Sequence, residues 1–234
     1  MTPAVPFLVA AVLGVVPGQE PAPPKPSAET ARAAAELLKA HAERCRGTAV
    51  LVADYVQRRT TQLAKEPLVS SGRFVFVREP GCVVFRATEP RESVTRLRAD
   101  TYEVHRPQKK QLERFVLDGP ELAASLFAAL GGDVDTLQRD FEVRAAGPDP
   151  DRKELVAVVL EPRRPEVRAR LTELRLTFAA KDRALAAVAY RDAAGDLVEI
   201  ELRNPVVNPA PPPSIEFELA PDTAVIEHGP EKRR

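Results

Sequence analysis

Short runs of β-forming residues, separated by turn signals, fill most of the chain after Gly47 and constrain its fold more than any other feature. Residues 72–78 read Gly-Arg-Phe-Val-Phe-Val-Arg, and Pro80-Gly81 directly after them is a strong turn signal. Short strands joined by short turns pair as antiparallel neighbours. We therefore expect residues 48–219 to supply about a dozen strands of one antiparallel sheet.

Two segments carry a helical period instead. Residues 29–44 repeat apolar side chains at helical spacing, and Ser27 precedes them as a suitable N-cap. A second helix is expected at residues 120–130, where three leucines share one face: Leu122, Leu126 and Leu130. The predicted fold class is mainly β (α+β), a curved antiparallel sheet or incomplete β-barrel with helices covering one face.

The amino terminus carries an apolar run at residues 5–16 that ends in Val16-Pro17-Gly18. The run is shorter than the ~20 residues of a membrane-spanning helix, and small residues follow it where a signal peptidase cleaves. We expect a signal peptide at 1–18, cleaved near Gly18, a Pro-rich linker at 19–28, one domain at 29–228 and a tail at 229–234. Because no Lys or Arg precedes the run, a disordered apolar tail is the alternative interpretation.

Composition and motifs argue against several classes of function. Lys plus Arg and Asp plus Glu are both 34, so no strongly basic face for nucleic acid is expected. The three histidines, His41, His105 and His228, lie outside any recognisable catalytic or metal motif, and GxSxG, HExxH, Walker and GxGxxG patterns are missing. We expect no enzymatic activity, no cofactor and no metal site.

The two cysteines, Cys45 and Cys82, leave two possibilities open. In an oxidising compartment they pair as one disulfide; otherwise they are buried, unpaired thiols. Their spacing matches neither a metal site nor a CxxC redox motif.

Residues 70–81 read Ser-Ser-Gly-Arg-Phe-Val-Phe-Val-Arg-Glu-Pro-Gly. This stretch resembles the small-Gly-x-Phe-x-Phe-x-basic-Arg-Pro-Gly strand and turn of the periplasmic outer-membrane lipoprotein carrier proteins, the LolA-like family. Later stretches are similar to further motifs of that family: Glu89-Pro90, residues 104–107, residues 140–143, and Asn208 followed by residues 217–221. The resemblance covers roughly residues 29–227.

The resemblance implies an incomplete antiparallel barrel whose concave face is covered by helices. It also implies a soluble, monomeric periplasmic carrier that shields the acyl chains of lipoproteins, or of a related lipid, during transfer towards the outer membrane. The implied partners are the acylated cargo, an inner-membrane releasing transporter and an outer-membrane acceptor. Each buried methylene is worth ~0.8 kcal/mol, so such a carrier needs an apolar concavity under a movable lid. A periplasmic sensor or interaction module of the same fold, binding a peptide or a regulatory partner, is the alternative.

The lipid-binding wall that we predict combines strand residues and residues of the 120–130 helix. The strands supply Val75, Val77, Val83, Phe85, Leu97 and Val104, and the helix supplies Leu122, Leu126, Phe127 and Leu130. The family's Arg before the Pro-Gly turn, which ties the lid to the sheet, is Glu79 here. Arg78 stands one residue earlier and is expected to face the other side. Both are candidate lid-lock residues.

Overall fold

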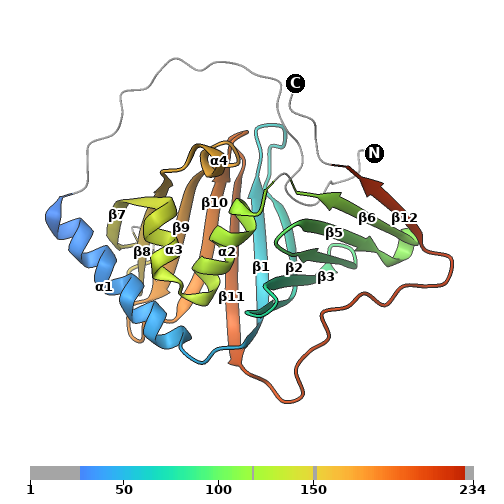
Figure 1. The fold of residues 1–234 in the computed structure, drawn as a ribbon, viewed down its shortest axis with the longest axis horizontal. Helices are drawn as coiled ribbons and strands as arrows, with labels where there is room; N and C mark the ends of the chain where they lie inside the picture. The colour runs from blue at the N-terminus through green and yellow to red at the C-terminus, as the bar shows by residue number, and fades with distance from the viewer. Residues whose placement is uncertain (1–26, 118, 150–151, 230–234) are drawn as a thin grey trace.

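The computed structural model describes residues 27–117, 119–149 and 152–229, with the side chain of Leu122 left out (Figure 1). The predicted signal peptide at 1–18, nearly all of the linker at 19–28 and most of the tail at 229–234 lie outside the described residues.

Twelve strands, four α-helices and one 3₁₀ turn make up the described chain. The strands are β1 (Val50–Thr60), β2 (Leu68–Val77), β3 (Cys82–Glu89), β4 (Ser93–Leu97), β5 (Thr101–Arg106), β6 (Gln111–Val116), β7 (Phe141–Pro148), β8 (Leu155–Pro162), β9 (Leu171–Ala179), β10 (Leu185–Asp192), β11 (Leu197–Val207) and β12 (Ala224–His228). The helices are α1 (Ala28–Cys45), α2 (Glu121–Gly131), α3 (Val134–Asp140) and α4 (Pro165–Arg168), and the 3₁₀ turn is η1 (Pro107–Lys109).

All twelve strands belong to one sheet, in the order β12-β6-β5-β4-β3-β2-β1-β11-β10-β9-β8-β7. Neighbouring strands are antiparallel, except that β12 runs parallel to β6. β1 pairs with β11 in the middle of the sheet, so β7 and β12 remain as the two unjoined edges. The sheet curves without closing, and α1, α2 and α3 lie over the half that β7–β11 form (Figure 1). This architecture confirms the predicted fold class.

Local sequence explains where the covering helices begin and end. The Ser27 hydroxyl accepts a hydrogen bond from the backbone N–H of Thr30 at 3.1 Å, which caps α1. The buried face of α1 consists of Ala34, Leu37, Leu38 and His41. α2 ends where Gly132 takes a left-handed conformation, with φ at 71°, a backbone that glycine adopts without steric cost.

The register of β2 and β3 assigns their side chains to two faces. Phe74 lies opposite Phe85, whereas Val75 lies opposite Val84. Since successive strand residues point to opposite faces, the sheet is apolar on both sides here. Two separate cores result: a large one between the concave face and the helices, and a small one on the convex face. The small one consists of Val52, Val75, Cys82, Val84 and Val94.

The segment 208–223, here called the strap, crosses the convex face and covers the small core. Its residues Ile215 and Phe217 pack against that core. The Arg86 guanidinium donates to the carbonyl oxygens of Ser214 and Glu216, each at 3.0 Å. The sequence predicted strands as far as residue 219, including one at residues 215–219, but residues 208–223 contain no strand, so this part of the prediction was wrong. The strap is irregular because arginine side chains, rather than a neighbouring strand, hold its backbone.

Arg96 of β4 connects the sheet to the strap and also forms a buried ion pair within the sheet. Arg96 donates to Glu103 on β5 and to Glu216 of the strap, both at 2.7 Å, and its guanidinium lies 4.3 Å from the centre of the Phe217 ring. The side chains of Arg96 and Glu103 are only 7% and 3% exposed. Burial raises the pKa of Glu103, but hydrogen bonds from Arg96 and Arg114 outweigh it and hold the pKa below its ordinary value.

Replacing Arg96 by Met is expected to destabilise the protein by about 3–5 kcal/mol, because Glu103 then keeps a buried charge with one partner fewer. Arg98→Met is the matched control: Arg98 binds the same Glu216 carboxylate at 3.2 Å, but both side chains are partly exposed. The control change is expected to cost less than about 1 kcal/mol. Urea unfolding of both variants measures the difference, and equal losses would contradict the importance of the buried pair.

Candidate functional site

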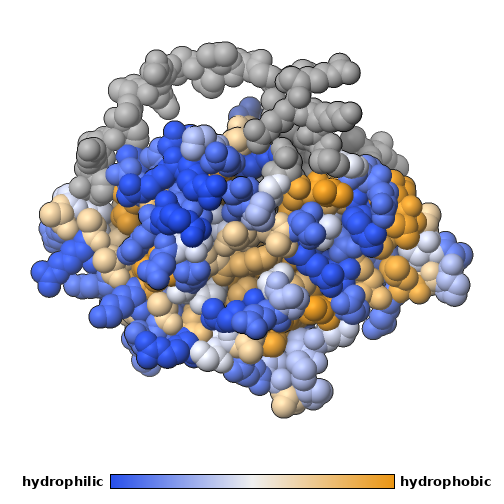
Figure 2. All heavy atoms as spheres, viewed as in Figure 1, coloured by the Kyte–Doolittle hydropathy of each residue, from blue (hydrophilic) through white to orange (hydrophobic). Residues whose placement is uncertain are grey.

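An apolar hollow lies on the concave face between the sheet and α2. Its lining comes from six strands and one helix: β2, β3, β4 and β5 on one side of β1, β10 and β11 on the other, and α2 above them. The lining residues are Phe74, Val83, Phe85, Thr95, Leu97, Tyr102, Val188, Tyr190, Ile200 and Leu202 from the sheet, with Leu126 and Leu130 from α2. Apolar residues gather over α2 and the strands beside it, between hydrophilic flanks (Figure 2).

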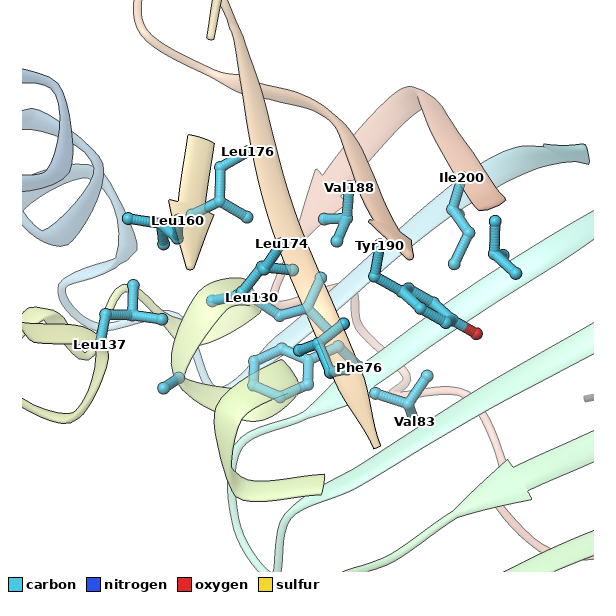
Figure 3. Packing of buried hydrophobic residues seen from close by; sticks show 14 of the residues in the cluster. Phe76, Val83, Leu130, Leu137, Leu160, Leu174, Leu176, Val188, Tyr190 and Ile200 are labelled. Atoms are coloured by element: carbon cyan, nitrogen blue, oxygen red, sulfur yellow. The ribbon is translucent and has the colours of Figure 1, made fainter. Parts of the chain in front are cut away.

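Aromatic side chains pack along the sheet side of the hollow. The rings of Phe74 and Phe85 meet at 5.3 Å between centroids, and Tyr55 meets Phe85 at 5.1 Å. Tyr190 and Ile200 face the same space (Figure 3). Burial raises the pKa of Tyr55 to about 12 and raises the pKa of Tyr190 as well, so both hydroxyls stay neutral at physiological pH.

The hollow is small as the structure stands, with a cavity volume of about 50 Å³. A water molecule needs about 10–15 Å³ of such space, so there is room for a few waters and none for a long hydrocarbon chain. Two of the lining residues, Leu126 and Leu130, belong to α2. Any large apolar ligand therefore requires α2 to move away from the sheet.

Three side chains hold the carboxyl end of α2, where helical carbonyl groups lack partners within the helix. His41 Nε2 lies 2.8 Å from the carbonyl oxygen of Ala129, and since a carbonyl only accepts, this nitrogen carries the proton. Cys45 Sγ donates to the carbonyl of Leu130 at 3.7 Å. We call these two residues and Arg78 the α2 clamp.

Arg78 is the charged member of the clamp. Its Nη2 donates to the carbonyl of Gly131 at 2.9 Å and to that of Cys45 at 3.0 Å, and its Nε donates to that of Thr48 at 2.7 Å. The expectation that Arg78 faces away from the lid was wrong. Phe74 and Phe76 belong to the concave core, and Arg78, two residues after Phe76, continues their alternation on that side; the error was in which face of β2 is concave. Glu79, the other lid-lock candidate, is exposed.

Half of the predicted wall residues do lie together. Val83, Phe85, Leu97, Leu126 and Leu130 line the hollow. Val104 belongs to the same core without lining the cavity, and Phe127 packs against that core, with its ring 6.4 Å from the ring of Phe76. For Leu122 only the position in α2 is described. That any of these residues binds lipid stays a prediction.

From the sequence, Val75 and Val77 were placed in the lipid-binding wall, but both lie on the convex face. Val75 is part of the convex core, and Val77 packs against it from the same face. Their neighbour Phe74 lines the hollow in their place, since the pairing of Phe74 with Phe85 puts these two rings on the concave side. The sequence Phe-Val-Phe-Val is apolar at every position, so it did not reveal which pair faces inward.

Several lining residues were missed by sequence reasoning: Phe74, Thr95, Tyr102, Val188, Tyr190, Ile200 and Leu202. Alternation in β11 contained a usable signal, because Val198, Ile200 and Leu202 are buried between exposed or half-buried residues. What the sequence alone did not supply was the pairing of β11 with β1, which brings Leu202 beside Tyr55.

Side chains that bind metals do not gather anywhere in the part of the chain that the structure describes. There, no group of three or more His, Cys, Asp or Glu side chains is placed to hold a metal ion. Cys45 and Cys82 are both free thiols, Cys82 buried and Cys45 half-buried. None of the helices among the described residues has the length and hydropathy that crossing a bilayer demands.

Comparison with known proteins gives one family. The family described as "Outer membrane lipoprotein carrier protein LolA" matches residues 46–219. A search of curated protein sequences finds no match.

Solved structures that resemble this chain share little sequence with it. An uncharacterized conserved protein from Thermus thermophilus has a TM-score of 0.46 and 11% identity, covering 83% of this chain and 99% of that one. A putative outer membrane lipoprotein-sorting protein domain from Vibrio parahaemolyticus has a TM-score of 0.40 and 11% identity, covering 75% and 93%. The MucA/MucB complex from Pseudomonas aeruginosa gives 0.39 and 13%, covering 78% and 59%.

Two buried histidines predict how stability changes with pH. Burial lowers the pKa of His41 and of His105 below the ordinary 6.5. As the pH falls, the two histidines therefore take up protons in the unfolded chain before they do in the folded chain. The stability that the neutral histidines contribute is complete above about pH 6.5 and is lost as the pH falls below that value. We expect the melting temperature to fall between pH 7 and about pH 5.

The double variant His41→Gln/His105→Phe is expected to flatten this fall, since Gln still donates to the Ala129 carbonyl and Phe still packs against Phe217. Thermal unfolding followed by circular dichroism across the pH range measures both slopes. A double variant as pH-sensitive as the parent chain would contradict the assignment.

Proposed function

Because this chain belongs to the LolA family of outer membrane lipoprotein carrier proteins, we propose that it carries acyl chains of lipoproteins, or of a related lipid, in the hollow beneath α2. The observation that supports this most is the lining itself, which is made of aliphatic and aromatic side chains with hydroxyls as its only polar side-chain groups. Each methylene that enters such a lining is worth ~0.8 kcal/mol, so a long chain gains enough to compete with a membrane.

In this proposal α2 is a lid, and binding requires it to move. Lid movement exchanges contacts of Leu126 and Leu130 with the sheet for contacts with the acyl chain, so the apolar faces stay covered. The α2 clamp would set how readily the lid opens, with Arg78 as the lid lock. Glu79 has no such role in the proposal, since the clamp is complete without it.

The family also supplies the setting that we propose. The carrier would work in the periplasm after removal of a signal peptide at 1–18, receiving cargo from an inner-membrane releasing transporter and delivering it to an outer-membrane acceptor. The chemistry that we assign to it is binding and release, without any bond made or broken.

Filling the hollow should weaken the binding of apolar ligands. In Leu126→Trp the larger side chain occupies the cavity of about 50 Å³ and obstructs the space that opens when α2 moves. We expect the affinity for Nile red, an apolar fluorescent probe, to fall at least about tenfold, which corresponds to losing the burial of two methylenes. Fluorescence titration measures it.

Leu63→Trp is the matched control, because Leu63 is 99% exposed in the turn between β1 and β2, where the same side chain fills nothing. Mass spectrometry of protein purified from detergent-extracted membranes tests the proposal independently by detecting bound acyl species. Equal probe binding by both tryptophan variants, together with no acyl species in any preparation, would refute the carrier function.

Removing Arg78 from the α2 clamp should speed the entry and exit of an apolar ligand. Arg78→Met removes the hydrogen bonds to the carbonyls of Gly131, Cys45 and Thr48, and we expect Nile red to enter and leave roughly ten times faster. Arg73→Met is the control, since Arg73 is an exposed arginine on the convex side of the same strand. Stopped-flow fluorescence measures the rates, and unchanged rates in Arg78→Met would remove Arg78 as the lid lock.

A further inference from the structure

Gln57 is a polar residue on the concave face of β1, next to residues that line the hollow. It lies in β1, directly opposite Ile200 on β11 and opposite Ser70 on β2. Ile200 lines the hollow, as does Leu202, which lies opposite Tyr55 two residues earlier in β1. Since residues two apart in a strand share a face, Gln57 points to the same side as Tyr55.

The side-chain carbonyl of Gln57 is buried without a hydrogen-bond partner among the described residues. The whole residue is only 7% exposed. A buried acceptor that makes no hydrogen bond loses its hydration without compensation, so most such groups in proteins are paired. An exception beside a candidate binding cavity calls for a functional explanation.

The polar groups nearest to Gln57 along the sheet are engaged with other partners. The hydroxyl of Ser70 is hydrogen-bonded with Tyr55. Arg59, the next concave residue of β1, donates to Asp196 through Nε at 3.0 Å and through Nη2 at 2.6 Å. The Gln57 carbonyl is therefore an acceptor that these neighbours leave available.

We propose that Gln57 Oε1 is the polar recognition point of the hollow and accepts a hydrogen bond from the N–H of an amide-linked acyl group. An ester linkage offers oxygen acceptors only, whereas a secondary amide also offers a donor, and an acceptor such as Gln57 Oε1 discriminates between them. The acyl chain would then run from Gln57 past Ile200 and Leu202 beneath α2. This inference rests on the proposed carrier function and names the substrate class of that same site.

A matched series of three probes tests the proposal by displacement of Nile red. N-methylpalmitamide has an N–H at the linkage, methyl palmitate has an ester there, and N,N-dimethylpalmitamide has an amide without the N–H. We expect the native chain to bind N-methylpalmitamide about tenfold more tightly than the other two. Gln57→Met keeps the length and burial of the side chain without the carbonyl, and is expected to bind all three probes equally.

Ser70→Ala is the control, because it removes a neighbouring hydroxyl on the same face and should leave the tenfold preference intact. Equal affinities for the three probes in the native chain, or a preference that persists in Gln57→Met, would overturn the role of Gln57 and leave the carrier function standing. Failure of all three probes to displace Nile red would overturn the carrier function and, with it, this inference.

Discussion

Around β2 and β3 the sheet is apolar on both faces, and much of the structure follows from the need to cover each of them. In β2 and β3 consecutive residues are hydrophobic, so neither face can be left to water without a large loss of free energy. The concave face is covered by helices that interrupt the strand order between β6 and β7 and precede β1. The convex face near β2–β4 is covered by the strap, which carries too few apolar residues to form a second layer and is held by arginines instead.

The two coverings differ in how firmly they are held. The strap is fixed by Arg96, which donates to the Ile215 carbonyl and the Glu216 carboxylate, and by Asn208, whose side chain accepts from the backbone N–H groups of Ala49 and Val50. α2 contacts the sheet through a face that includes small alanine side chains, and it is held at its carboxyl end by hydrogen bonds to three carbonyls. In the proposed carrier, α2 is therefore the covering element that moves, and the hydrogen bonds at its carboxyl end are what must break.

Periodicity was sufficient for the fold and insufficient for the site. The change from helical spacing to alternation after Gly47 predicted the sheet, and the leucines of residues 120–130 predicted the helix over it. Alternation does not say which face is inward where both faces are apolar, and this is why Val75 and Val77 were assigned to the wrong wall. Arg78 was misassigned for the same reason, because it continues the alternation of Phe74 and Phe76 on the concave side. The strap lies outside the ladder, where backbone direction depends on tertiary contacts.

The closed hollow and the α2 clamp together impose a threshold on any acyl ligand of the proposed carrier. If only a small fraction of molecules has the lid open, the apparent affinity is reduced by that fraction. Each methylene buried contributes ~0.8 kcal/mol, so a short chain cannot offset the clamp and the displaced contacts of Leu126 and Leu130, whereas a long one can. The contacts that hold α2 over the empty hollow therefore also select for long acyl chains. Such selection requires a cavity that, with α2 in place, is too small for the cargo.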